Sequence, residues 1–197
     1  MNRFTILTGF LNSQVSQSIS SYLINFPGID IRIIKDRDIG AGTGSAVINA
    51  AKYLDERFLI VNGDSVLSDT VVTKTNFEHA CNALELNKVA CCMYLGKPAW
   101  GDNSNVVLGS SSSVYGYKKE RSDVSSNTLF DYGACLWNRD LLLNLDAKNY
   151  KDIGDIYSLA ISMGKCIYIE VGGIYYDIGT YKGLSSYIES LVVDKIQ

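Results

Sequence analysis

The sequence predicts a single α/β domain in which helices cover both faces of a mainly parallel sheet, giving three layers. Short apolar runs rich in β-branched residues alternate with segments whose apolar residues recur at helical spacing. Strands that alternate with helices in this way normally lie parallel to one another. The chain has 197 residues, which is long enough for one domain to bury a sizeable core.

The alternation gives the expected elements in order. In the first half we expect strands at 3–9, 29–35, 57–62 and 88–95, and helices at 12–26, 42–54 and 70–86. In the second half we expect a hairpin at 105–119, strands at 129–138 and 166–171, and helices at 139–145, 152–164 and 180–196. The run of four serines at 110–113 is expected to form the turn of the hairpin.

Composition excludes several classes of function. Lys and Arg total 18 against 21 Asp and Glu, and this net charge of -3 argues against a nucleic-acid binder, although a small phosphorylated ligand needs only a few local donors. No apolar stretch approaches the roughly 20 residues of a membrane span, and no signal peptide is recognisable. The five cysteines form no C-x-x-C pair and His79 is the only histidine, so we expect no zinc site and a cytoplasmic protein.

The stretch "RFLIVNGDS" at 57–65 is the first candidate for chemistry. An apolar strand here ends in Asn62, Gly63 and Asp64. In a parallel sheet, ligands bind outside the carboxyl ends of the strands. Asp64 is therefore a candidate ligand-binding carboxylate, although an Asp after Gly also commonly caps a turn.

A second carboxylate, Asp177, lies in "GGIYYDIGTYKGL". Like Asp64, it stands at the end of an expected apolar strand, and it precedes the last expected helix, which it could simply cap. If Asp64 and Asp177 converge, they form a site for Mg²⁺, which takes oxygen ligands and usually binds one or two carboxylates together with substrate phosphates.

The stretch "DIGAGTGSAV" at 38–47 is rich in glycine but is not a dinucleotide fingerprint. The pattern G-x-G-x-x-G fails because Ser45 stands at the last position, and no Lys is placed as in a phosphate-binding P-loop. A glycine-rich entry to a helix remains, and its backbone could lie against a flat ligand. A tight turn with close packing of a helix on the sheet explains the glycines equally well.

Several motifs occur together, in one order along the chain. These are "GTGSAVINAAKYL", "RFLIVNGDS", "DNSNVV", "VYGYKK", "FDYGACLWNRDLL", "DIGDIY" and "YYDIGTYKGL". The set resembles the sugar-1-phosphate nucleotidyltransferases, and in particular the bacterial group found with heptose, capsule and lipopolysaccharide genes. The resemblance extends from about Arg3 to Val192 and implies their Rossmann-like fold, that of the nucleotide-diphospho-sugar transferases.

This resemblance implies an enzyme that joins a nucleoside triphosphate to a sugar 1-phosphate. The products are a nucleotide-sugar, used for surface polysaccharide synthesis, and pyrophosphate. Mg²⁺ is the implied cofactor. One domain, 1–197, would contain a nucleotide-binding half at 1–96 and a sugar-phosphate-binding half at 97–197.

The resemblance also implies roles for residues of the nucleotide half. Asp64 matches the metal-binding Asp that follows the third strand of this family, and Asp177 matches the second metal-binding Asp. Both are thus implied catalytic residues. The positions implied for nucleotide binding are Gly42, Thr43 and Gly44, which match the turn against the base, together with Asn62 and Gly63.

In the second half, Lys119 matches the catalytic lysine that holds the sugar phosphate. It stands in "YKK" where many relatives have "EKP", so either Lys118 or Lys119 could take this role. Gly133 matches a glycine whose amide faces the sugar. The implied substrate-binding residues are Asn105, Lys118, Asp131, Tyr132 and Gly133.

One family motif is absent from the sequence. The family begins with a strand and a loop, G-G-x-G-T-R-L, that holds the triphosphate, whereas Met1 stands where the second strand would begin. We expect unpaired strand edges, which a homo-oligomer or a complementing chain would cover. The alternative function is a catalytically degenerate subunit that binds nucleotide-sugar or a partner.

Overall fold

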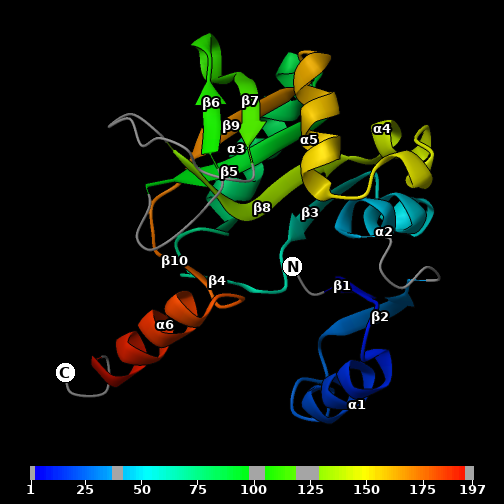
Figure 1. Cartoon of the computed structure of the whole chain (residues 1–197), viewed down its shortest axis with the longest axis vertical. Coiled ribbons are helices and arrows are strands. Elements are labelled where there is room, and N and C mark those ends of the chain that lie inside the picture. The colour runs from blue at the N-terminus through cyan, green and yellow to red at the C-terminus, as the bar shows by residue number, and fades with distance from the viewer. Residues whose placement is uncertain (1–2, 37–41, 98–104, 119–128, 194–197) are drawn as a thin grey trace. The chain divides into compact units, whose positions relative to one another are not determined.

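The computed structural model describes residues 3–36, 42–97, 105–118 and 129–193 (Figure 1). The chain divides into two compact units. Unit 1 consists of Met1–Glu56 and Arg139–Ile156, and unit 2 consists of Arg57–Asn138 and Tyr157–Gln197. The prediction of two functional halves, 1–96 and 97–197, concerns their substrates and stays a prediction.

Unit 1 contains a two-stranded parallel sheet. Strand β1 (Arg3–Thr8) pairs with β2 (Asp30–Lys35), and helix α1 (Asn12–Leu23) connects them. Helix α1 thus forms the crossover connection that two parallel strands need. The other elements of unit 1 are α2 (Thr43–Ala50), the 3₁₀ helices η1 (Ala51–Tyr53) and η3 (Ala147–Asn149), α4 (Arg139–Leu143) and the start of α5 (Ile153–Ser162).

Unit 2 is built on a four-stranded sheet in the order β3-β8-β5-β9. Its strands are β3 (Arg57–Val61), β5 (Cys91–Gly96), β8 (Phe130–Asn138) and β9 (Cys166–Glu170). Strand β8 is antiparallel to both β3 and β5, whereas β5 and β9 are parallel. A mixed α/β fold with a central sheet is therefore confirmed, and β8 lies between β3 and β5.

Helices cover both faces of this central sheet, as Figure 1 shows for α3 (Lys74–Asn87) and α5. Every residue of β5 is buried because the strand is central and covered on both sides. Leu84 of α3 belongs to the buried cluster on one face, together with Tyr94 and Tyr132. On the other face, Tyr157 of α5 stacks on Trp137 with ring centroids 5.7 Å apart.

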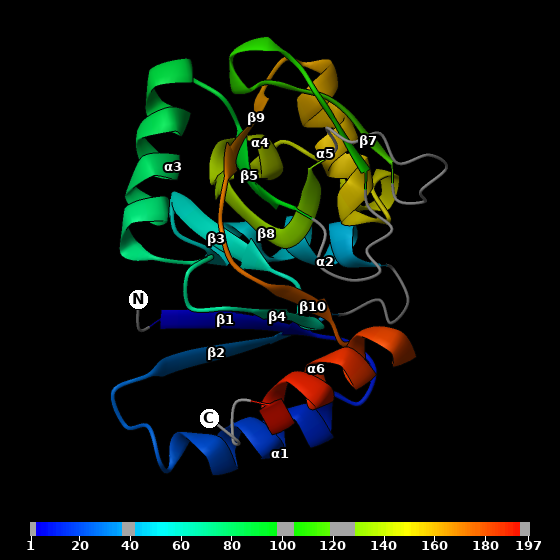
Figure 2. The same ribbon diagram turned by 90° about the vertical axis from the view of Figure 1, so that its left-hand side faces the viewer.

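Two small antiparallel pairs complete unit 2. Strand β4 (Ser65–Leu67) pairs with β10 (Tyr175–Asp177), and Figure 2 shows the two side by side with α6 (Tyr181–Val193) directly after β10. Strand β6 (Asn105–Leu108) pairs with β7 (Val114–Lys118) as the predicted hairpin, and the 3₁₀ helix η2 (Ser110–Ser112) forms its turn. The sequence predicted that Asp177 ends an apolar strand, as it does in β10, but it did not predict β4.

In the described part of the chain, β1 and β3 are among the strands that have one edge without a strand partner. Strand β1 pairs only with β2, and β3 pairs only with β8. Apolar side chains on both strands are correspondingly accessible, with Phe4 41% and Val61 45% exposed. None of the helices in the described ranges has the length and apolar character needed to cross a bilayer.

Removing the hydroxyl of Tyr94 is expected to stabilise the protein. This oxygen is buried and has no hydrogen-bond partner among the described residues, so folding removes it from water without compensation. We expect Tyr94→Phe to raise the free energy of unfolding by about 1 kcal/mol, measured by urea denaturation. Tyr132→Phe is the matched control. The Tyr132 hydroxyl donates to Lys97 O at 2.9 Å, so its removal should lower the free energy of unfolding. A destabilised Tyr94→Phe protein would contradict the prediction.

Candidate functional site

Asp64 lies in a turn between two strands of unit 2. Strand β3 ends at Val61, and the amide of Ser65, which begins β4, donates to Asn62 O at 3.2 Å. This bond closes the turn without the Asp64 side chain. The carboxylate is exposed, and no hydrogen bond or ion pair engages it within the described residues. The turn is therefore formed by the backbone, which leaves the carboxylate available to a ligand.

Asp177 is the last residue of β10 and is held beside that turn. It lies opposite Ser65 in the β4–β10 ladder, and the amide of Ile178 donates to Asp64 O at 2.9 Å. Thr180, not Asp177, caps α6, because its Oγ1 accepts the Gly183 amide at 3.1 Å. The Asp177 carboxylate instead accepts the Gly179 amide at 3.1 Å through Oδ1. The pairing of β4 with β10 thus brings the two predicted carboxylates together.

Gly179 shows how closely the carboxylates converge. A Cβ atom placed on this glycine would lie 2.8 Å from Asp64 Oδ2 and 3.1 Å from Asp177 Oδ1. Both oxygens therefore approach the same point, and only the lack of a side chain at Gly179 leaves the space between them open.

The donor set fits a hard divalent cation. Mg²⁺ is usually held by one or two carboxylates together with substrate phosphates, and not by a cage made wholly of protein. No group of three or more His, Cys, Asp or Glu side chains suited to a metal occurs among the described residues. Ser65 Oγ, in the same turn, is buried without a hydrogen-bond partner there. The chemistry of the site matches a cation that its substrate helps to bind.

Gly133 of β8 packs directly against the Asp64 turn. Its φ of +67° is in the left-handed region, where a side chain would be strained. It lies in a bulge, because β8 carries extra residues between the pairs Leu95↔Asp131 and Met93↔Cys135. Its carbonyl accepts the Asn62 amide at 2.8 Å, and its own amide donates to Asp131 Oδ1 at 2.9 Å.

The neighbours of Gly133 are both buried. Asp131 is 5% exposed and Tyr132 is 1% exposed. The Tyr132 ring stacks on Tyr175 at 5.4 Å, and its hydroxyl lies within hydrogen-bond distance of the backbone carbonyls of Lys97 and Gly173, at 2.9 and 3.2 Å. In this structure Tyr132 is a core residue, and the Gly133 amide is occupied by Asp131. Contact of either group with a sugar stays a prediction.

The predicted sugar-phosphate residues lie at one end of the β6–β7 hairpin. Asn105 pairs with Lys118 in the ladder, and the side chain of Lys118 is exposed. Lys119 lies outside the described residues. The hairpin thus brings together the backbones of two predicted substrate-binding positions, one an asparagine and the other a lysine.

Gly42, Thr43 and Gly44 belong to unit 1, where they are fastened to the segment 150–153. The amide of Gly44 donates to Lys151 O at 3.1 Å, and Thr43 Oγ1 accepts the Ile153 amide at 3.1 Å. A Cβ at Gly44 would lie 2.4 Å from Asp152 O, so close backbone packing already requires this glycine. A role beside a nucleotide base stays a prediction.

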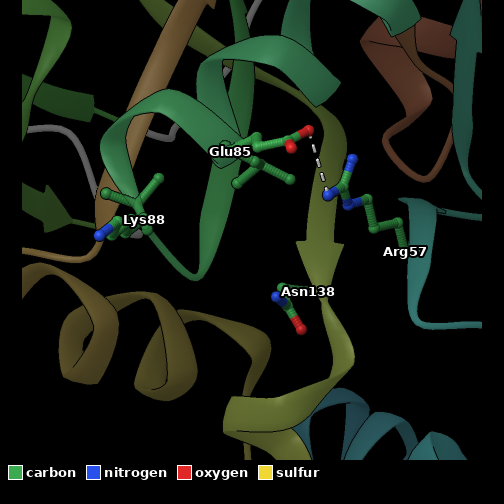
Figure 3. Close-up of a pocket in the computed structure, with 6 residues that line it drawn as sticks. Arg57, Glu85, Lys88 and Asn138 are labelled. Carbon is green, nitrogen blue, oxygen red and sulfur yellow. Dashed lines mark hydrogen bonds and ion pairs between the residues drawn. The ribbon is translucent and has the colours of Figure 1, made fainter.

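A shallow pocket of about 270 Å³ occurs at the opposite end of β3. Figure 3 shows Arg57, Glu85, Lys88 and Asn138 around it, with Arg57 bonded to Glu85 at 3.4 Å. Arg57 begins β3, whereas Asp64 follows the end of that strand. An exposed ion pair of this kind contributes little to stability, and none of the predicted site residues lines this pocket.

Sequence reasoning missed two contributors to the site. Gly179 and Ser65 flank the aspartates, but neither was singled out. The sequence does contain a signal for Gly179: in "YYDIG" a glycine stands two residues after Asp177. Ser65 gives no such signal, because its importance comes from the burial of its hydroxyl.

Comparison with known proteins agrees with the resemblance seen in the sequence. No protein-family model matches the chain. A bifunctional GlmU protein of Methanococcus maripaludis is 29% identical over 170 residues, which cover 83% of this chain and 38% of that protein. The chain therefore spans well under half the length of this curated relative.

Solved structures share the fold across nearly the whole chain. HddC from Yersinia pseudotuberculosis has a TM-score of 0.70 at 13% identity, covering 97% of this chain and 79% of its own. The inositol-1-phosphate CTP transferase from T. maritima has a TM-score of 0.71 at 14% identity, covering 97% and 76%. An apo-UDP-glucose pyrophosphorylase has a TM-score of 0.72 at 13% identity, covering 98% and 82%. At such identities the likeness establishes the fold.

Proposed function

We propose that this chain, which resembles the sugar-phosphate nucleotidyltransferases in sequence and shares their fold, transfers a nucleoside monophosphate from a nucleoside triphosphate to a sugar 1-phosphate. The observation that carries the proposal is the convergence of Asp64 and Asp177 at Gly179. Other solved forms with this fold were complexed with GMP-PN, in the case of HddC, and with UDP-glucose, in the case of UDP-glucose pyrophosphorylase.

The reaction is a displacement at phosphorus. A phosphate oxygen of the sugar 1-phosphate forms a bond to the α-phosphorus of the triphosphate, and the bond from that phosphorus to the oxygen bridging to the β-phosphate breaks. Pyrophosphate leaves with the electron pair of this bond, so no covalent intermediate with the protein is needed. Positioning of the two substrates and neutralisation of their negative charge provide the catalysis.

The residues of the chain divide these tasks. Asp64 and Asp177 would hold Mg²⁺, which neutralises phosphate charge when bound. Lys118 or Lys119 would bind the phosphate of the sugar. The other positions proposed to line the substrates are Gly42, Thr43, Gly44, Asn62 and Gly63 for the nucleotide and Asn105, Tyr132 and Gly133 for the sugar.

The proposed setting is the cytoplasmic synthesis of nucleotide-sugars for lipopolysaccharide or capsule. The sequence resemblance to enzymes of that group supports it. Residues 1–96 would serve the nucleotide and 97–197 the sugar phosphate. The unpaired edges of β1 and β3 favour association with a second copy or a complementing chain.

Pyrophosphate release tests the proposed activity. The protein is assayed with each nucleoside triphosphate against a panel of sugar 1-phosphates, including heptose 1-phosphates, with Mg²⁺ and with EDTA. We expect release with one pairing, and its loss in EDTA. Binding of a nucleotide-sugar without turnover in any pairing would instead support a catalytically degenerate subunit. The absence of both turnover and binding would contradict both proposed functions.

Gly179→Ala is expected to weaken divalent-cation binding without unfolding the protein. The added methyl group would fill the space between the two carboxylates, 2.8 Å from Asp64 Oδ2. The backbone of Gly179 is not left-handed, so alanine causes no conformational strain there. We expect the Kd for Mn²⁺, measured by electron paramagnetic resonance, to rise about tenfold or more.

Gly172→Ala is the matched control for this variant. A Cβ on Gly172 would meet no atom within 4 Å, so its Mn²⁺ affinity should equal that of the unmodified protein. An unchanged Mn²⁺ affinity in Gly179→Ala would show that the cation does not bind between the carboxylates.

A further inference from the structure

Asp131 is a buried carboxylate whose side chain is directed at the backbone. It is 5% exposed, and burying such a group is costly unless hydrogen bonds compensate. Its Oδ1 accepts the Gly133 amide at 2.9 Å, and the Tyr117 hydroxyl lies 3.4 Å from its Oδ2. One oxygen thus contacts the bulge of β8, and the other contacts the hairpin strand β7.

The bulge that Asp131 holds is in contact with both sides of the Asp64 turn. The Gly133 carbonyl accepts the Asn62 amide at 2.8 Å. A Cβ on Gly133 would lie 2.9 Å from Asn62 Nδ2 and 2.5 Å from Ser65 Oγ. Asn62 and Ser65 are the residues whose backbone bond closes the turn that carries Asp64. A displacement of Gly133 would therefore move the turn.

We infer that Asp131 is a positioning residue for the cation site and acts through Gly133, not by contacting the sugar. By accepting the Gly133 amide, it fixes the left-handed conformation of the bulge. The bulge then fixes the Asn62–Ser65 turn, and the turn fixes the position of Asp64 beside Asp177. This inference rests on the proposed function, because it assigns a task to Asp131 within the cation site proposed there.

The sequence resemblance assigned Asp131 to the sugar, and the two roles have different consequences. A direct sugar contact would raise KM for the sugar phosphate and leave cation affinity unchanged in the absence of sugar. A positioning role changes cation affinity with no sugar present. It also depends on a hydrogen-bond acceptor at Oδ1 and not on negative charge, because the partner is a neutral amide.

Mn²⁺ binding to the full chain, measured by electron paramagnetic resonance without substrates, separates these possibilities. Groups that orient metal ligands typically contribute 10–100-fold to affinity, so we expect Asp131→Ala to raise the Kd by about tenfold. Asp131→Asn keeps an oxygen that can accept the amide and should stay within about twofold of the unmodified protein.

Asp146→Ala is the matched control. Asp146 Oδ1 also accepts the amide two residues ahead, that of Lys148, at 3.1 Å, but it does so in unit 1. Its loss should leave Mn²⁺ affinity unchanged. If Asp131→Ala binds Mn²⁺ as tightly as the unmodified protein does, the inference is overturned. Equal losses in Asp131→Ala and Asp131→Asn would also overturn it, because the effect would then come from charge.

A second variant covers the case in which Asp131→Ala does not fold. Gly133→Ala disturbs the same contact from the other side, since alanine is strained at φ +67° and its methyl group would clash with Ser65 Oγ. We expect a similar rise in the Kd for Mn²⁺, and an unchanged Kd would overturn the inference. If instead the unmodified protein binds Mn²⁺ no better than Asp64→Ala, the cation site itself is absent and the proposed function fails first.

Discussion

Asp64→Asn and Asp177→Asn are each expected to reduce the rate of pyrophosphate release by on the order of 100-fold or more, because each removes one of two anionic ligands from the proposed cation site. The charge on the phosphates would then be left without its main neutralising partner. In unit 2 the side chain of Asp64 is exposed and that of Asp177 is half-buried, and asparagine has nearly the same shape as aspartate, so neither substitution should unfold the protein. The rate is measured with the substrate pair identified in the assay above.

Asp69→Asn provides the control for these two variants. Asp69 is an exposed aspartate of the same unit, close to Asp64 in the sequence but in a separate turn after β4. Its substitution should change neither the rate nor Mn²⁺ affinity. Full turnover in either Asp64→Asn or Asp177→Asn would contradict the assignment of these residues, even if the protein proved to be a nucleotidyltransferase.

Trp137→Ala is expected to lower the free energy of unfolding by about 3–5 kcal/mol, the range for truncating a large aromatic residue in a core. Trp137 is 0% exposed, lies opposite Cys91 and Phe58 in the sheet, and stacks on Tyr157. Its removal would leave a cavity between β8 and α5 that rigid strands cannot close. Urea denaturation followed by circular dichroism measures the change.

Trp137→Phe separates lost volume from lost polarity. The indole Nε1 is buried without a hydrogen-bond partner among the described residues, so phenylalanine gives up no bond there and keeps a ring against Tyr157. We expect it to cost less than half as much as alanine. A loss below about 1 kcal/mol in Trp137→Ala would mean that the core repacks around the missing ring.

Local patterns in the sequence predicted most elements. The strand at 57–61 and the helices at 43–50 and 153–162 lie within their predicted ranges, because hydrophobic periodicity and flanking glycines act over a few residues. The helix predicted at 70–86 begins only at Lys74, since Thr73 caps it by accepting the Asn76 amide at 3.0 Å. Helix boundaries of this kind depend on a single side chain.

Non-local pairing could not be predicted in the same way. The antiparallel strand β8 separates β3 from β5, although its sequence gives no direction relative to them. Strands β4 and β10 have three residues each, too few to show a period of two. The sequence therefore contained both strands of the ladder at the site without any signal that they pair.

Residue types and their local order along the chain were enough to predict an α/β fold, a resemblance to the sugar-phosphate nucleotidyltransferases, and two aspartates as candidate ligands. Two features of the site appear only in the folded chain. The Gly133 amide donates to Asp131, two residues away, in a bulge that forms where β8 pairs with β5. Asp64 and Asp177 meet at Gly179 because backbone hydrogen bonds join β4 to β10, which lie far apart in the chain. Such bonds use groups that every residue possesses, so residue type does not reveal them.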